Sequence, residues 1–338
     1  MTVGGALLTV RELRTVFRTA SGPLRAVDGI SFDVQPGERL GIVGESGSGK
    51  SVTALSILGL VPAPQASISG EASFDGVDLL GLPRSELRRI RGARIGMIFQ
   101  NPLHSLDPTM TVGRQIEEAI LAHQRVGRRM AHARAVDLLG QVGIPSPGRA
   151  ADEYPHRFSG GMRQRVMIAM ALSCEPDLII ADEPTTALDV TIQAQIIELL
   201  DSLCRERGTA VVLITHDLAL LAGFADRILV MYAGRIVEQA TVDTIYYRPA
   251  HPYTWGLMTA VTRVDQPRPE RVSAIQGSPP SGLSVPPGCA YHPRCPHAQD
   301  VCRTSEPRLL PLEEADHQAA CHFAGELIPP TQVRGETA

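Results

Sequence analysis

The sequence predicts an α/β fold with a mostly parallel sheet, followed by a loop-rich C-terminal module. Three observations predict it. From residue 1 to about 258, short apolar runs alternate with segments of helical periodicity, which is typical of an α/β unit. A glycine-rich loop joins one of these runs to a helical segment, and prolines and cysteines become frequent beyond residue 260. We therefore expect two domains, residues 1–258 and residues 259–338.

Composition narrows the function classes. Of the 338 residues, 43% are apolar and 20% are charged, which allows a sizeable core and disfavours global disorder. The net charge of −4 argues against a general nucleic-acid binder, although a local basic groove stays possible. No apolar run approaches the roughly 18 residues that span a bilayer, and the N-terminal residues lack the features of a signal peptide. We expect a cytosolic chain that reaches any membrane through a partner.

The predicted elements follow one another in a simple order. Five apolar runs are predicted as strands: residues 39–44 (RLGIVG), 95–99 (IGMIF), 178–182 (LIIAD), 210–215 (AVVLIT) and 228–232 (ILVMY). The last run and residues 235–239 predict a hairpin. Residues 111–140 predict a mostly helical subdomain. Eight prolines between residues 264 and 296 disfavour helices and central strands, so that a linker and a loop-rich module are expected there.

A phosphate-binding loop follows the first predicted strand. Its residues match the pattern GxxxxGK[ST]: Gly44, Glu45, Ser46, Gly47, Ser48, Gly49, Lys50 and Ser51. Glycines let the backbone N–H groups and a helix N-terminus face an anion closely. Lys50 would add a charge for the β- and γ-phosphates, and the Ser51 hydroxyl would ligate Mg²⁺.

An acidic pair ends the predicted strand over residues 178–182. Asp182 would hold Mg²⁺ directly or through water. Glu183 is then placed to polarise an attacking water. By itself, an Asp-Glu pair after a strand is an ordinary surface turn, but together with the phosphate-binding loop it indicates a nucleotide-hydrolysing site.

A second glycine-rich helix start reveals the family. Residues 158–165 read FSGGMRQR, which resembles the signature sequence of ABC ATPases at Ser159, Gly160 and Gly161, although Met162 and Phe158 replace the usual Gln and Leu. Further residues match the family's motifs in order: Phe17 the adenine-stacking aromatic, Gln100 the Q-loop, Asp189 in Ala187-Leu188-Asp189 the D-loop, and His216 the switch histidine. The resemblance covers roughly residues 7–250.

The resemblance implies a nucleotide-binding domain with a RecA-like core, an antiparallel β subdomain and an α-helical subdomain. It implies hydrolysis of ATP with Mg²⁺ held by Ser51, Gln100 and Asp182. Glu183 would orient the water, while His216 and Gln100 would sense the γ-phosphate. One chain cannot use both of its anion-binding loops on one nucleotide, so the signature of one subunit is expected to close over the ATP of a second subunit.

Three further regions are similar to one group of the family. Residues 100–108 (QNPLHSLDP), residues 251–254 (HPYT) and the cysteine-rich tail resemble the ATPases of dipeptide, oligopeptide and nickel importers. This implies two transmembrane permease subunits, a second ATPase subunit and, indirectly, an extracytoplasmic binding protein, with the chain on the cytoplasmic face of the membrane. Peptide import is favoured and nickel import is the close alternative. A soluble ABC ATPase acting on nucleic acid or the ribosome is the rival from another class.

Four cysteines fall in the last fifty residues: Cys289, Cys295, Cys302 and Cys321. In a reducing compartment such a cluster indicates metal binding before disulfides. The gaps of five, six and eighteen residues do not fit the close pairs of a zinc ribbon. We therefore predict a 4Fe–4S cluster, with zinc and free thiols as alternatives.

Overall fold

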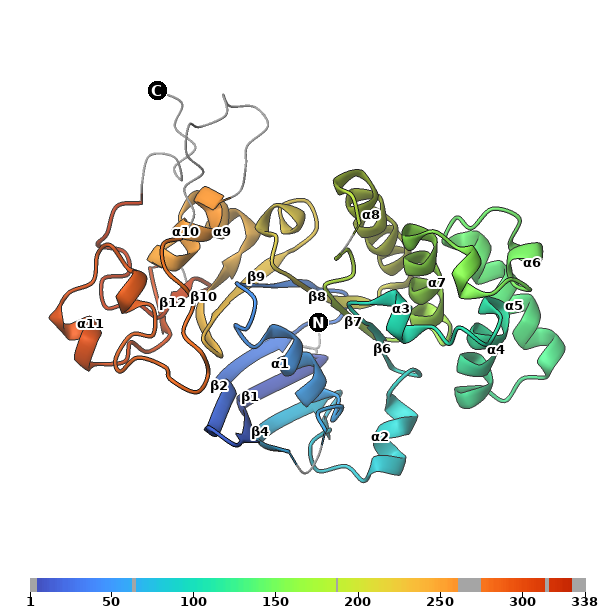
Figure 1. Cartoon of the computed structure of the whole chain (residues 1–338), viewed down its shortest axis with the longest axis horizontal. Coiled ribbons are helices and arrows are strands. Elements are labelled where there is room, and N and C mark those ends of the chain that lie inside the picture. Colours follow the sequence, from blue (N-terminus) through green and yellow to red (C-terminus); the bar gives the residue numbers. More distant parts are fainter. Residues whose placement is uncertain (1–4, 63–64, 187, 261–274, 314–315, 330–338) are drawn as a thin grey trace. The chain divides into compact units, whose positions relative to one another are not determined.

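The computed structural model describes residues 5–62, 65–186, 188–260, 275–313 and 316–329 (Figure 1). The chain divides into two compact units. The first comprises Met1–Leu7, Val34–Arg39 and Gly81–Ile214, and the second comprises Leu8–Asp33, Leu40–Leu80 and Thr215–Ala338. The predicted linker falls largely on residues 261–274, outside the described residues.

The first unit is organised around three parallel strands. They are β6 (Ile95–Ile98), β7 (Leu178–Asp182) and β8 (Ala210–Thr215), with β7 between the other two. Every residue of β7 and β8 is buried, as expected for parallel strands that are covered on both faces. Asp182 therefore ends a strand that the apolar sequence forces into the core.

Helices make up most of the rest of the first unit. They are α2 (Arg84–Ile90), α3 (Pro102–Ser105), α4 (Val112–His123), α5 (Arg128–Gln141), α6 (Pro147–Ala150), the 3₁₀ turn η1 (Pro155–Arg157), α7 (Gly160–Leu172) and α8 (Val190–Arg207). Helices α4, α5 and α7 pack against one another around apolar side chains such as Ile116, Leu139 and Val166. This confirms the helical segment predicted from residues 111–140 and supports the start of α7.

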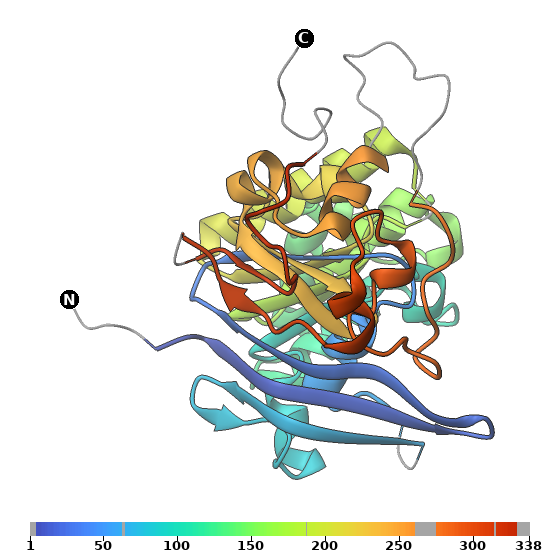
Figure 2. The ribbon, with the colours of Figure 1, turned by 90° about the vertical axis from the view of Figure 1, so that its left-hand side faces the viewer.

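The second unit contains an antiparallel sheet in the order β2-β1-β4-β5. Its strands are β1 (Leu8–Thr19), β2 (Gly22–Val34), β4 (Ala66–Phe74) and β5 (Val77–Asp78), and the two long N-terminal strands stand out in blue in Figure 2. Only the family resemblance predicted an antiparallel part. The strands themselves carry many polar residues and lack a continuous apolar run.

The other sheet of the second unit has the order β11-β12-β10-β9-β3. Strands β3 (Arg39–Val43) and β9 (Arg227–Tyr232) are parallel, whereas β10 (Arg235–Thr241), β12 (Gln318–Ala319) and β11 (Leu310–Pro311) continue antiparallel. The β9–β10 hairpin confirms the predicted one. Figure 2 shows the C-terminal residues, in red, beside this hairpin.

Short helices complete the second unit. They are α1 (Lys50–Ile57), η2 (Leu218–Leu221), α9 (Val242–Tyr247), α10 (Pro252–Ala260), η3 (His292–Arg294) and α11 (Asp300–Thr304). Within the described part of the chain, no helix combines the length and the apolar character needed to cross a membrane.

Candidate nucleotide-binding site

The phosphate-binding loop, residues 44–51, follows β3 and runs into the first turn of α1, as its motif requires. Gly49 stands just before α1 with a left-handed φ of 103°. A Cβ on Gly44 would lie 2.2 Å from the carbonyl oxygen of Met231, and one on Gly49 would lie 2.3 Å from that of Ala26. Only glycine fits this close approach of two backbones, so the two outer glycines of the motif are required by the local geometry.

The loop leaves hydrogen-bond donors free for a phosphate. Among the described residues, the backbone N–H groups of Ser46, Gly47 and Gly49 have no hydrogen-bond partner. The Ser48 hydroxyl is buried, and it too has none. A Cβ placed on Gly47 would meet open space. Unpaired donors at a helix N-terminus favour an anion, so the residues present fit the phosphates of ATP.

Lys50 lies inside the loop with only 4% of the residue exposed. Its Nζ donates to the carbonyl oxygens of Gly44, at 2.7 Å, and Glu45, at 3.0 Å. A buried ammonium must keep such partners, and the phosphates of a nucleotide would offer it stronger ones.

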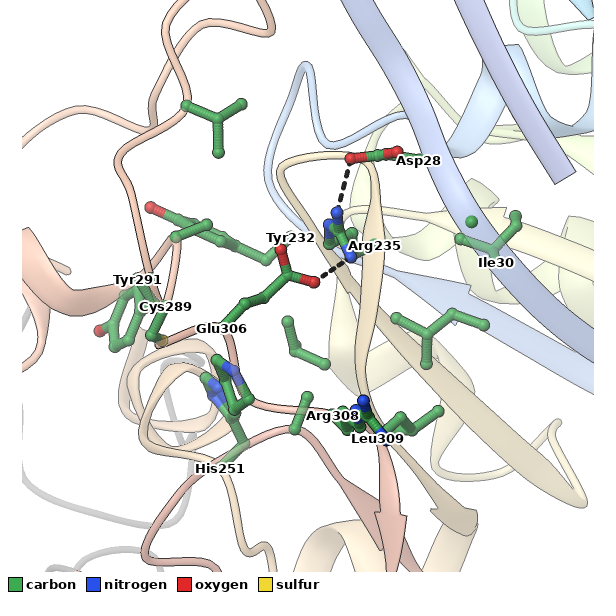
Figure 3. A pocket seen from close by; sticks show the side chains of 18 of the residues that line it. Asp28, Ile30, Tyr232, Arg235, His251, Cys289, Tyr291, Glu306, Arg308 and Leu309 are labelled. Carbon is green, nitrogen blue, oxygen red and sulfur yellow. Dashed lines mark hydrogen bonds and ion pairs between the residues drawn. The ribbon is translucent and has the colours of Figure 1, made fainter. Parts of the chain in front are cut away.

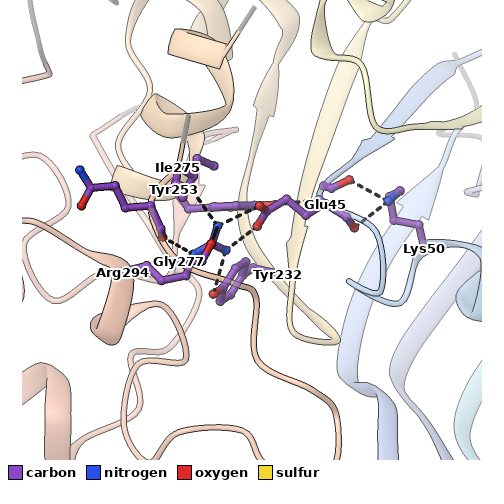
Figure 4. A network of polar contacts seen from close by, with 9 residues as sticks. Glu45, Lys50, Tyr232, Tyr253, Ile275, Gly277 and Arg294 are labelled. Atoms are coloured by element: carbon purple, nitrogen blue, oxygen red, sulfur yellow. Dashed lines mark hydrogen bonds and ion pairs between the residues drawn. The ribbon is translucent and has the colours of Figure 1, made fainter. Parts of the chain in front are cut away.

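Glu45 connects the loop to the C-terminal part of the second unit (Figure 4). The Arg294 guanidinium forms two bonds to its carboxylate, at 2.6 and 2.9 Å. The backbone N–H of Glu45 donates to the Tyr253 hydroxyl at 2.8 Å. The glutamate holds the pKa of Arg294 above its usual value, while burial raises the pKa of Tyr253. Sequence reasoning missed both contacts. Arg294 belongs to no motif recognised in the sequence, and the HPYT segment that contains Tyr253 indicated the importer group but not a contact with Glu45.

At the end of β7, the structure brings together two residues that the sequence predicted separately. Gln100 Nε2 donates to Glu183 Oε2 at 2.8 Å, although 83 residues separate them. Thr186 Oγ1 donates to the same oxygen at 2.9 Å, a contact that the sequence did not suggest. Asp182, one residue earlier, is buried. Glu183 has a left-handed φ of 45°, a costly backbone conformation for a residue other than glycine, and the two hydrogen bonds hold its carboxylate.

The signature residues lie on the surface of the first unit. Ser159 is the N-cap of α7, and its hydroxyl accepts a hydrogen bond from the Met162 N–H at 3.3 Å. Ser159 and Gly160 are exposed, and Gly161 is half-buried. The N-terminus of a 13-residue helix therefore opens outward at this loop.

The remaining predicted residues have simple positions. Asp189 is the N-cap of α8, accepting from the Ile192 N–H at 3.0 Å. His216 is the first residue after β8 and is exposed, and Phe17 is half-buried on β1. Ala187 of the predicted D-loop lies outside the described residues.

The segment after Gln100 is fastened from within. The Gln115 side chain accepts from the Asp107 N–H at 2.9 Å and donates to the carbonyl oxygens of Asp107 and Met110. Asp107 in turn accepts two bonds from Thr109, which lower the pKa of its carboxyl group. Leu103 of α3 nevertheless stays 64% exposed. An apolar side chain is thus presented on a rigidly held turn.

The structure contradicts the predicted 4Fe–4S cluster and its zinc alternative. The four cysteines do line one small cavity, of about 20 Å³: Cys289, Cys295, Cys302 and Cys321. Yet, across the described ranges, no three His, Cys, Asp or Glu side chains form a group that could hold a metal ion. All four are free cysteines. Burial raises the pKa of Cys295 and of Cys321 to about 11, so these groups stay protonated at neutral pH. The predicted metal cluster was wrong because the spacing of cysteines in the sequence does not determine whether their thiols adopt a ligand geometry.

A larger open cavity of about 640 Å³ also lies in the second unit (Figure 3). Arg235 stands in its wall between Asp28, which it contacts at 2.7 Å, and Glu306, to which it also donates. None of the residues predicted to bind nucleotide lines this cavity. Its ion pairs fasten the C-terminal residues to β2 and β10.

Comparison with known proteins places these features in a family. Residues 27–186 match the family described as ABC transporter, and residues 237–302 match the oligopeptide/dipeptide transporter C-terminal region. The oligopeptide transport ATP-binding protein AppD of Bacillus subtilis (strain 168) is 49% identical over 90% of this chain and 93% of its own length. The dipeptide transport ATP-binding protein DppD of Escherichia coli (strain K12) is 51% identical, over 94% and 97% respectively.

Solved structures agree with this placement. The dimeric structure of MJ0796, a bacterial ABC transporter cassette, has a TM-score of 0.63 and 30% sequence identity, covering 70% of this chain and 98% of that one. The fold and the loops thus define an ABC-type ATPase with mixed α/β sheets. The chain belongs to the ABC transporter ATP-binding proteins of the oligopeptide and dipeptide group.

Proposed function

We propose that this chain hydrolyses ATP to drive the import of di- or oligopeptides through membrane permease subunits. The hydrogen bond from Gln100 to Glu183 carries the catalytic part of the proposal, because it joins two predicted residues of the hydrolytic site on one carboxylate. The relatives, which are named for oligopeptide and dipeptide transport, support peptides as the substrate class.

The roles in the ATP site follow from the chemistry of each side chain. Lys50 and the backbone N–H groups of Ser46, Gly47 and Gly49 bind the phosphates, and Phe17 stacks on the adenine. Ser51, Gln100 and Asp182 would hold Mg²⁺, which would neutralise charge on the phosphates. Glu183 accepts a proton from the attacking water, while Gln100 and His216 respond to the γ-phosphate.

The signature loop acts on a neighbouring subunit. Ser159, Gly160 and Gly161 offer a helix N-terminus to the γ-phosphate of ATP bound to a second cassette, and Asp189 lies at that interface. The surface exposure of Ser159 and Gly160 supports this role. ATP binding then joins two cassettes, and hydrolysis separates them. The second cassette is either a copy of this chain or a homologous chain.

The permease subunits dock on the turn that follows Gln100. Leu103, 64% exposed, and Phe99, 41% exposed, offer apolar surface beside this turn. Partially exposed apolar side chains on a fixed turn suit helix docking. The chain then works on the cytoplasmic face of the membrane, without contacting nucleic acid, and an extracytoplasmic binding protein delivers the peptide.

We propose that the chain has two domains, an ABC domain at residues 1–258 and a C-terminal extension at residues 259–338. The ABC domain comprises a RecA-like core, an antiparallel β subdomain and a helical subdomain. The extension is a loop-rich module whose short elements β11 and β12 continue the sheet of β10. Free thiols, rather than a metal, lie at its cysteine cavity.

One experiment tests the function. The chain is co-expressed with its candidate permease subunits, purified in lipid nanodiscs, and assayed for ATP hydrolysis with and without peptide-loaded binding protein. We expect hydrolysis to rise when the peptide-loaded protein is added. Stimulation by nickel-loaded protein instead would favour nickel import, and stimulation by DNA or ribosomes would favour the soluble rival.

A further inference from the structure

Every polar group of Glu45 has a partner, and two of the partners come from the C-terminal part of the chain. Its carboxylate binds Arg294, and its N–H donates to Tyr253. Its carbonyl oxygen accepts from Lys50 Nζ and from the Ser48 N–H, at 3.0 and 3.2 Å. Glu45, the second residue of the phosphate-binding loop, is therefore held through its carboxylate, its N–H and its carbonyl oxygen.

The Arg294 side chain is itself held in place before it meets Glu45. It is 5% exposed, and its Nε donates to the Gln276 carbonyl oxygen at 2.9 Å. Its Nη1 donates to the Tyr232 hydroxyl at 3.3 Å, and the guanidinium carbon lies 5.8 Å from the centre of that ring. A third contact goes to the Gly277 carbonyl oxygen. The guanidinium is thus a fixed, buried fork to which a carboxylate binds with two charge-assisted bonds.

The pair reaches the phosphate-binding lysine through the backbone. Lys50 donates to the carbonyl oxygen of Glu45, whose direction depends on how the rest of that residue is anchored. If Glu45 were free to rotate, the loop would sample more conformations, and ordering them would reduce affinity for nucleotide. A fixed Glu45 keeps the loop close to the shape that binds phosphate.

We propose that Arg294 is a positioning residue for the phosphate-binding loop, so that the segment between Cys289 and Cys295 sets the affinity of the site for ATP. The inference rests on the proposed role of Lys50 and the loop in nucleotide binding. Arg294 acts through Glu45 and does not touch the substrate. The C-terminal extension is then part of the ATP site's support, beyond any role in transport.

The test compares MgATP affinity in four variants of the full chain: Arg294→Ala, Arg294→Lys, Glu45→Gln and the double variant Arg294→Ala/Glu45→Gln. Arg303→Ala is the matched control, since that arginine is exposed in the same C-terminal region. We expect Arg294→Ala to weaken affinity by about tenfold, with kcat changed by less than about twofold, and Arg294→Lys to recover part of it. The double variant should be no weaker than the worse single variant, because both changes remove one interaction.

A second readout follows the loop without nucleotide. Lys50 is the only lysine in the sequence, so lysine labelled with ¹³C and ¹⁵N gives one side-chain NMR signal from the loop. We expect this signal to shift or broaden in Arg294→Ala and in Glu45→Gln, and to stay unchanged in Arg303→Ala. Glu45→Gln leaves Arg294 its carbonyl and hydroxyl partners, so it tests the inference even if Arg294→Ala does not fold.

The outcomes separate this inference from the proposed function. Additive losses in the double variant, or an unchanged Lys50 signal and unchanged affinity in Glu45→Gln, would overturn the positioning role. Unaltered ATP affinity in Lys50→Ala would instead overturn the assignment of the phosphate-binding loop. If Lys50→Ala loses affinity while the variants at residues 45 and 294 do not, only the positioning role fails.

Discussion

The two glycine-rich loops of this chain begin helices in the same way, yet they differ in how they are held. In the phosphate-binding loop, Gly44, Gly49 and Lys50 are buried, and distant residues such as Arg294 hold it. At the signature loop, Ser159 is exposed, and all its hydrogen bonds to described residues lie within the first turn of its own helix. Distant residues of the same chain hold the phosphate-binding loop, whereas the signature loop presents its N-cap residue on the surface. That difference is what two cassettes sharing ATP would need.

The largest expected effect tests chemistry at the first unit. Glu183→Gln should bind ATP normally but hydrolyse it about 10²–10⁴-fold more slowly, because the amide cannot accept the proton of the attacking water. The measurement is single-turnover hydrolysis in the assembled complex. Glu198→Gln, the same change on the exposed face of α8, is the control and should keep wild-type turnover. Near-normal hydrolysis in Glu183→Gln would remove this residue from the catalytic role.

The next largest expected effect is a loss of nucleotide affinity at the phosphate-binding loop. Lys50→Ala should weaken MgATP binding about 10–100-fold, since it removes a charge-assisted contact to the phosphates. Equilibrium titration with a fluorescent ATP analogue measures this. Because Lys50 also bonds two loop carbonyls, thermal unfolding of the same variant must be compared. A loss of stability without a loss of affinity would assign the lysine a structural role only.

The sequence predicts those parts of the two loops that a local pattern of residues determines. Strands β7 and β8 have the predicted bounds, because continuous apolar runs ending in a polar residue leave little choice. The motif spacing also located both helix starts. By contrast, the Arg294–Glu45 pair spans 249 residues, and nothing in either neighbourhood indicates the other. Its existence depends on how the chain after residue 250 returns to β9, which is a tertiary property.

At the four cysteines of the C-terminal part, the sequence pattern led to a wrong prediction. The four thiols line one small cavity, but the 4Fe–4S cluster predicted from their clustering was wrong, because a ligand set depends on angles and distances that spacing does not determine. The long strand β1 was missed for a related reason. It pairs with β4 through a bulge and carries exposed charges, so neither a clean alternation nor an apolar run marks it.

A smaller effect is expected from a substitution in the signature loop. Ser159→Ala should lower stability by about 1 kcal/mol, because α7 loses its N-cap. In the assembled complex it should also reduce ATP hydrolysis, since it disturbs the helix start that we propose to meet the neighbour's γ-phosphate. Thr111→Ala removes an equivalent N-cap, that of α4, and serves as the control in isolated cassettes. If both variants lower ATP-driven association of cassettes equally, the signature loop has no special role in it.

The smallest expected effect is a pH dependence of stability at the residues that support the phosphate-binding loop. Burial lowers the pKa of His251 to about 4, against an opposing pull from the Glu238 carboxylate, so the ring is neutral at pH 7. Its Nδ1 then accepts from the N–H of Tyr253, the residue whose hydroxyl holds Glu45. The ring also packs near Tyr291.

The sign follows from linkage. Because the folded pKa lies below the unfolded value of about 6.5, the unfolded chain binds more protons between these two values. Stability is therefore complete above pH 6.5 and falls as the pH drops toward 4, by about 1 kcal/mol between pH 7 and pH 5.5. Urea unfolding at both pH values should show this loss in the wild type and a smaller one in His251→Gln. His216→Gln, at an exposed histidine, should retain the wild-type loss. If the free energy of unfolding depends on pH equally in all three proteins, His251 does not have the lowered pKa. Protonation of His251 would then not weaken the contacts that hold the phosphate-binding loop.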